Sequence, residues 1–227
     1  VIKEMLEIGI PAVLMQAIGS VMTFLLNMIL GSLTMVATTV FGVYFKLQSF
    51  AFMPVFGLNN SLIPIVAYNY GAQKRKRIVR VSIVSCLFAL FFMTAGLVLM
   101  QVIPAQMLGI FNVAEGAPEM RIGVQALRTI SLSFIFAGIS ITIGGVFSAF
   151  GKSLFSMFVS IARQLLVLLP VAYLLAQTAD GLIAIWWSFP IAELMSICAS
   201  VVFLIVLWHK TIKHLPEDGA LIRSEDI

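Results

Sequence analysis

Long apolar segments alternate with short polar ones along this 227-residue chain. A helix needs about 20 apolar residues to cross the hydrocarbon core of a bilayer. Six segments are long enough, and they lack the two-residue alternation of membrane β-barrel strands. These segments are residues 8–30, 36–68, 81–103, 122–149, 154–177 and 182–208. The pattern predicts an all-α membrane protein in which residues 1–208 form a bundle of six transmembrane helices.

The composition agrees with lipid as the main solvent of this bundle. Apolar residues make up 61% of the chain and charged residues only 11%, whereas a soluble domain carries about 25% charged residues. The mean hydropathy is +1.08. Residues 209–227 are polar, and we expect them to form a disordered cytoplasmic tail. The chain begins at Val1 and not at a methionine, which suggests a piece of a longer protein.

Basic residues gather on one side of the predicted bundle. Residues 1–7, the loop after Tyr68, the loop around Lys152 and the segment after Trp208 hold ten Lys or Arg, whereas the opposite loops hold Arg121 alone. Short loops rich in Lys and Arg stay in the cytoplasm. We therefore expect a multi-pass protein of the cell membrane with both ends of this segment inside. The net charge of +4 then reflects these loops and does not indicate nucleic-acid binding.

Four charged residues lie within the predicted spans. Arg128 is near the end of its span and can extend its side chain to the interface. Lys46, Arg163 and Glu193 are deeper, where an unpaired charge costs at least a few kcal/mol. We expect Glu193 to pair with Lys46 at matching depth, with Arg163 as the alternative partner. The three residues are candidates for ion coupling, and bracing of the bundle is the alternative role.

One face of the second predicted span mixes several chemistries. Lys46, Phe50, Met53, Gly57 and Asn60 follow one another at steps of three or four, so they share a helix face. A cation, an aromatic ring, a thioether and an amide suit the wall of an adaptable cavity for amphiphilic molecules. Each amide alone could instead hold neighbouring helices together.

The predicted substrate cavity includes further residues. Its full set is Gln16, Lys46, Gln48, Phe50, Met53, Phe56 and Asn60. Pro54, Gly57 and Pro64 are predicted bending points of the same span, because proline removes a helix hydrogen bond and clashes with the preceding turn. Phe52 is expected to add apolar contact to the cargo.

The sequence contains no motif that indicates an enzyme. The only histidines, His209 and His214, follow the last span, so the predicted bundle offers no histidine-based metal site or nucleophile–base pair. No glycine-rich phosphate loop precedes a helix. Gly144 and Gly145 are expected to serve helix packing or bending. We expect no enzyme activity, no cofactor and no metal.

Three stretches are similar to one transporter family. They are FKLQSFAFMPVFGLNNSLIPIVAYNYGAQKRKR from Phe45, FSAFGKSLFSMFVSIARQLLVLLPVAYLL from Phe147 and GLIAIWWSFPIAE from Gly181. They resemble the eighth helix, the region around the Gly-Lys turn and the last helix of multidrug and toxic compound extrusion (MATE) transporters. The resemblance implies helices seven to twelve of a twelve-helix antiporter, whose N-terminal six-helix lobe would be the partner of this one.

The resemblance also implies a mechanism. Family members alternate between inward- and outward-open states and export amphiphilic, often cationic compounds in exchange for protons or sodium. Some sodium-coupled members carry acids in the seventh and tenth helices, but residues 8–30 and 122–149 here contain none. Ion coupling is then expected in the N-terminal lobe, with protons favoured. The alternatives are a lipid-linked oligosaccharide flippase of related fold and a non-transporting membrane accessory subunit.

Overall fold

The computed structural model describes residues 2–114 and 116–216, with the side chains of residues 2–8, 11, 12 and 16 excepted. Within this part of the chain the secondary structure is helical, without strands. The α-helices are α1 Ile2–Leu33, α2 Met35–Gly71, α3 Arg75–Val102, α4 Pro104–Gly109, α5 Pro118–Ser131, α6 Phe134–Ala149, α7 Ser153–Ile161, α8 Leu169–Ala176, α9 Gly181–Ala184 and α10 Ser188–Lys210. A π-helix, η1 Ala162–Leu168, and two 3-10 helices, η2 Ile185–Trp187 and η3 Ile212–His214, complete the described chain.

These helices give six crossings by length and composition. Five helical stretches are each long and apolar enough to span a membrane, and α5 and α6 form one more span that is bent by 47°. The all-α fold class predicted from the sequence is confirmed. Residues 31–35, expected to be a loop, are almost wholly helical because α1 runs to Leu33 and Thr34 caps α2, its hydroxyl accepting from the Val36 amide at 3.3 Å.

The bend between α5 and α6 has a local cause. The hydroxyls of Ser131 and Ser133 donate to the carbonyls of Arg128 and Ile130, at 3.1 and 2.6 Å. Such back-bonding competes with the helix ladder and bends helices. Gln101 on α3 completes the joint, since its amide donates to the Arg128 carbonyl at 2.8 Å and to the Ser131 hydroxyl at 3.1 Å.

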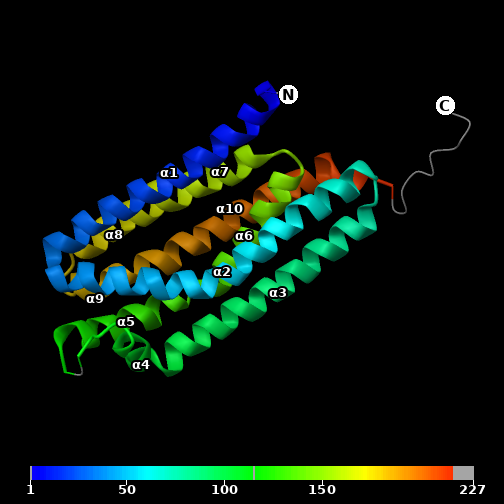
Figure 1. Ribbon diagram of the computed structural model, residues 1–227. Coiled ribbons are helices and arrows are strands. Elements are labelled where there is room, and N and C mark those ends of the chain that lie inside the picture. The colour runs from blue at the N-terminus through cyan, green and yellow to red at the C-terminus, as the bar shows by residue number, and fades with distance from the viewer. Residues whose placement is uncertain (1, 115, 217–227) are drawn as a thin grey trace, which may run out of the picture.

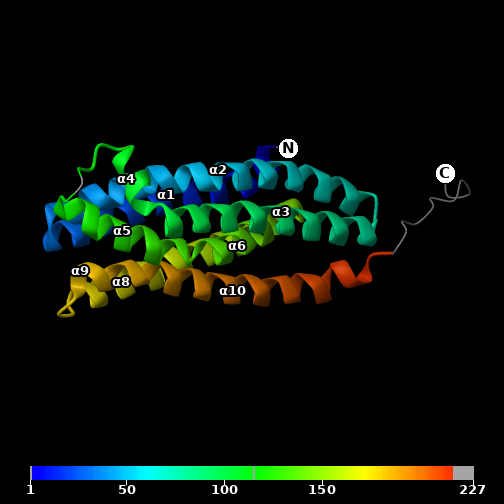
Figure 2. The same cartoon turned by 90° about the horizontal axis from the view of Figure 1, so that it is seen from below.

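The helices form two groups around α6. Figure 1 shows α1 beside α7 and α8, whereas α2 runs beside α3, and Figure 2 shows α6 between the α2–α3 pair and α10. Two apolar cores result. The larger core contains Phe41, Tyr44, Phe134 and Trp186. The smaller core lies where α3 begins and α10 ends, around Ile78 and Leu207.

Small residues let α6 approach its neighbours closely. A Cβ added at Gly145 would lie 1.9 Å from Asn59 Oδ1 on α2, and one at Gly138 would lie 2.9 Å from Met93 Cγ on α3. Helix packing in membranes uses such small residues to bring backbones together. The packing role expected of Gly145 is therefore seen, and Asn59 is the side chain that fills the space it leaves.

The end of α10 differs from the expected tail. Residues 209–227 were predicted to be disordered, but α10 continues to Lys210 and Ile212 in η3 is buried in the smaller core. The amide of Arg75 donates to the Pro216 carbonyl at 3.2 Å, which joins this segment to α3. Residues 217–227 lie outside the described residues.

Candidate functional site

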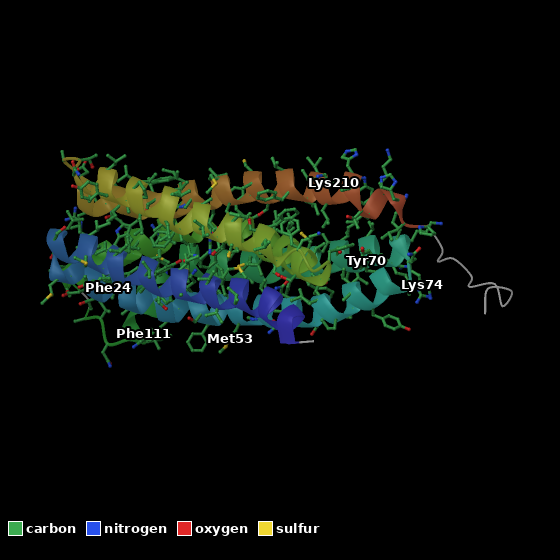
Figure 3. The ribbon with its side chains drawn as sticks, turned by 90° about the horizontal axis from the view of Figure 1, so that it is seen from above. Phe24, Met53, Tyr70, Lys74, Phe111 and Lys210 are labelled. Atoms are coloured by element: carbon green, nitrogen blue, oxygen red, sulfur yellow. The ribbon has the colours of Figure 1, made fainter. Side chains whose placement is uncertain are left out.

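The mixed face of α2 is uncovered in this bundle. Lys46, Phe50, Met53, Gly57 and Asn60 are all exposed, and the two large apolar side chains, Phe50 and Met53, are 72% and 69% exposed. The opposite face of α2 is packed against α3 and α6. Figure 3 shows Met53 at the edge of the bundle, well away from α10. The predicted cavity face is thus a continuous exposed strip that includes a cation and an amide.

The two prolines of α2 add polar groups to this strip. Pro54 and Pro64 lie inside the helix, which runs without a break from Met35 to Gly71. Proline has no amide hydrogen, so the carbonyls four residues earlier, on Phe50 and Asn60, lose their helical donor. Both carbonyls belong to residues of the exposed strip. They give it two hydrogen-bond acceptors beyond its side chains.

Other members of the predicted set lie elsewhere. Phe56 is 51% exposed and its ring centroid is 6.1 Å from that of Phe52. Phe52 itself is buried against Phe134, so the apolar contact expected of it is made inside the lobe. Gln48 is half-buried on a different face of α2. Gln16 is part of α1, but its side chain lies outside the described residues.

Lys46 does not pair with Glu193, and this expectation was wrong. The Lys46 ammonium lies 5.7 Å from the ring centroid of Phe111, a cation–π contact at the edge of the bundle. The α10-facing side of α2 carries Tyr44, whose ring packs edge-on against Phe189 at 5.8 Å. Two residues further along an α-helix, a side chain points almost to the opposite side. Lys46 therefore points away from α10 and from Glu193, although the two residues were expected at the same depth in the membrane.

Glu193 pairs instead with Arg163, the alternative partner. The Arg163 guanidinium donates to Glu193 Oε1. The Glu193 side chain is 11% exposed and that of Arg163 is 33% exposed, so the pair is mostly shielded. Glu193 Oε2 is buried and has no hydrogen-bond partner within the described residues. A buried carboxylate oxygen of this kind calls for a further donor or a cation.

This ion pair forms part of the wall of a cavity whose lining mixes polar and apolar side chains. The cavity has a volume of about 160 Å³ and lies between α1, α6, α7 and α10. Five serines share its lining with the ion pair: Ser140, Ser156, Ser160, Ser196 and Ser200. The hydroxyl of Ser140 is buried and likewise lacks a partner in the described part of the chain. The cavity presents serine hydroxyls and one carboxylate beside the guanidinium of Arg163.

The backbone at Arg163 departs from the α-helix. The π-helix η1 covers residues 162–168 and includes Arg163 and Gln164. Pro170 follows two residues after the end of η1, and the Leu169 amide reaches back five residues to the Gln164 carbonyl. A π-turn accommodates the carbonyl that would otherwise meet the proline ring. Single π-turns are frequent at functional sites.

The sequence analysis missed the serine cavity. The sequence does contain a signal for this cavity. Ser156, Ser160 and Arg163 are spaced by four and three residues. On α10, Glu193, Ser196 and Ser200 are spaced by three and four residues. Each triplet therefore marks one helix face. Serines are common in membrane helices, so a serine points to a functional cavity only where it shares a helix face with a charged residue.

Comparison with known proteins identifies the family. The family model MatE matches residues 11–174. This chain belongs to the MatE family. Multidrug export protein MepA of Staphylococcus aureus is 28% identical to it over 214 residues, covering 90% of this chain and 44% of MepA. The MATE family is a family of transporters, and this chain spans less than half the length of such curated relatives.

Solved structures of MATE transporters share the fold. An inward-facing multidrug resistance MATE family transporter superposes with a TM-score of 0.83 over 94% of this chain, at 18% identity. An outward-facing one gives 0.85 over 90% of this chain, also at 18% identity. The chain covers 49% and 46% of these two proteins. The chain is thus a multi-pass helical bundle with the fold of about half a MATE transporter.

Proposed function

We propose that this chain is the C-terminal lobe of a secondary active antiporter that exports amphiphilic, often cationic drugs or metabolites. The observation that carries the proposal is the exposed strip of α2, which presents apolar, cationic and amide groups on a side not covered by the lobe itself. An N-terminal six-helix lobe of the same full-length protein would face this strip across the transport cavity. The relation to multidrug export protein MepA supports this class of cargo.

The proposed mechanism is alternating access in the cell membrane. The lobe resembles the inward- and outward-facing transporters almost equally, with TM-scores of 0.83 and 0.85. This supports a lobe that moves largely as one body while the partner lobe rocks against it. Pro54, Gly57 and Pro64 would bend α2 during this movement, and Phe50, Met53, Phe56, Gln48 and Asn60 would contact the cargo, together with Gln16. Both ends of the chain would face the cytoplasm.

Protons or sodium would drive export, and the serine cavity is the candidate coupling site in this lobe. Protonation of Glu193 would release Arg163, and a bound cation would satisfy Glu193 Oε2. Lys46 stays a coupling candidate on the strip. The alternatives are that the ion pair only braces the bundle and that acids of the partner lobe carry the coupling.

The direct test is efflux of a fluorescent lipophilic cation from energised cells that express the full-length protein. Proton and sodium gradients are collapsed separately with ionophores, and an empty vector gives the background. Efflux that stops with one ionophore supports the antiporter and names its ion. Absence of efflux from cells with confirmed membrane insertion contradicts it and directs the next assay to lipid-linked sugars, the substrates of a flippase.

A further inference from the structure

A row of serines extends from the buried ion pair toward one end of the bundle. The chain from α7 into η1 runs antiparallel to α10, because Arg163 contacts Glu193 while the rings of Phe155 and Phe203 stack at 4.9 Å. Between these two contacts lie four serines of the cavity lining: Ser156, Ser160, Ser196 and Ser200. From Glu193 to Ser200 α10 rises about 10 Å, at 1.5 Å per residue. The row therefore leads from the carboxylate toward the end of α10 at Lys210.

The cavity has both the room and the polar groups to hold water. The hydroxyl of Ser140 and Oε2 of Glu193 are buried and make no hydrogen bond within the described residues. Ser196 and Ser200 also line the cavity and are each only 1% exposed. A volume of about 160 Å³ accommodates about five water molecules at roughly 30 Å³ each. Buried water typically bonds such unsatisfied polar groups, so a short chain of water can reach Glu193.

A phenylalanine cluster, Phe147, Phe155 and Phe203, lies beyond the serines. Phe147 lines the cavity, and its ring lies edge-on to that of Phe155 at 5.7 Å between centroids. Phe155 in turn stacks on Phe203. Lys152 and Lys210, at the start of α7 and the end of α10, are exposed, and Figure 3 shows Lys210 at this end of the molecule. The cluster therefore separates the cavity from this end, and apolar constrictions of this kind exclude water and ions.

We propose that the serine row is a water path by which protons reach Glu193 from the end of the bundle at Lys210, and that the phenylalanine cluster is its gate. The inference rests on the proposed function, since it names the route of the coupling proton. A proton passed along the water binds Glu193 Oε2 as an O–H group, so Glu193 becomes neutral and Arg163 loses its counter-charge. Among the described residues, the titratable groups near Glu193 are Arg163 of η1 and Tyr44 of α2. Proton relays in membranes use such buried acids beside water-filled cavities.

The experiment measures how fast silver ions reach a cysteine beside Glu193 in membrane vesicles that contain the full-length protein. Silver is a small water-borne cation, and thiolates bind metals. The probe is Ser196→Cys, with Cys86 and Cys198 replaced by serine. In a separate sample, Lys210→Cys shows from which side of the vesicle this end of the bundle is reached. Thiols that have not reacted are counted afterwards with a maleimide under denaturing conditions.

Opening the gate should speed this reaction. Phe155→Ala should raise the rate at Ser196→Cys at least about tenfold from the side on which Lys210→Cys reacts, equivalent to an entry barrier lower by about 1.4 kcal/mol. The matched control is Phe158→Ala, also on α7, whose ring is 54% exposed and lies outside the cluster. It should leave the rate unchanged. Thr142→Cys, a buried position of α6 that does not line the cavity, should stay unreactive in both backgrounds.

Three results would overturn the proposal. One is an equal rate in the Phe155→Ala and Phe158→Ala backgrounds. Another is a faster reaction only from the side opposite to Lys210→Cys. The third is an equal gain at Thr142→Cys, which would indicate a general loosening of the lobe and no path. Should Phe155→Ala fail to fold, Phe203→Ala removes the other stacked ring and gives the same comparison with the same expected gain. Export enters none of these readouts, so failure of the path is distinguishable from failure of the antiporter proposal.

Discussion

Removal of Arg163 should destabilise this lobe more than removal of its partner Glu193. Arg163→Gln leaves a carboxylate that is 11% exposed and has no other described partner. Breaking a buried ion pair from one side costs about 3–5 kcal/mol, and we expect about 3 kcal/mol because serine hydroxyls also line the cavity. Glu193→Gln leaves a guanidinium that is 33% exposed. Since this group can reach water, we expect a smaller loss of about 1–2 kcal/mol.

The double variant Arg163→Gln/Glu193→Gln should recover most of the loss, to within about 1 kcal/mol of the wild type, because no unpaired charge remains. The cycle then gives a coupling energy of at least about 3 kcal/mol. The assay is unfolding of the purified full-length protein in mixed micelles with increasing sodium dodecyl sulfate. Arg128→Gln is the control, since Arg128 is exposed. A double variant no more stable than Arg163→Gln would refute the pairing. Equal losses in the two single variants would refute the predicted difference between a shielded carboxylate and a more exposed guanidinium.

Three further predictions concern packing, charge and access. Gly145→Ala should cost about 1–3 kcal/mol of stability in the same unfolding assay, because the added Cβ would lie 1.9 Å from Asn59 Oδ1. The control Gly57→Ala, whose Cβ would have nothing within 4 Å, should not lose this stability. Equal losses in the two variants would contradict the close packing at Gly145. Lys46→Ala should lower the KM for a cationic cargo about fivefold in transport assays, as one repelled unit charge is worth about 1 kcal/mol near water, and an unchanged KM would remove Lys46 from the strip's function. With Cys86 and Cys198 replaced by serine, Met53→Cys should react with a water-soluble maleimide in native membranes and Phe91→Cys should not. The opposite result would mean that Phe91 faces the water-filled cavity and Met53 faces lipid.

The fold class could be predicted because long apolar segments have one stable solution in lipid, the helix. The bend between α5 and α6 could not be located, since the local serine bonds that cause it are completed by Gln101, a residue of another helix, which donates to the Arg128 carbonyl. The π-turn at Arg163 could not be predicted for a related reason. Pro170 signals a disturbed helix, but sequence spacing does not say whether the chain kinks or widens there.

The candidate site was predicted unevenly. The strip of α2 followed from helical spacing, and its five residues are exposed together. The partner of Glu193 was misassigned because depth along a helix axis was matched without the direction of each side chain. Tyr44, two residues before Lys46, occupies the side of α2 that faces Phe189. Tertiary packing decides this direction, and the sequence of one helix does not contain it.

Transport by the full-length protein in liposomes tests most directly whether the strip of α2 binds cargo. Asn60→Leu and Phe50→Ala change the strip, and Phe88→Ala changes another exposed phenylalanine, on α3, which is 53% exposed against 72% for Phe50. We predict that the two strip variants lose at least about tenfold in kcat/KM for a lipophilic cation, equivalent to about 1.4 kcal/mol, while Phe88→Ala transports normally. Normal transport by both strip variants, with the loss confined to Phe88→Ala, would contradict the account.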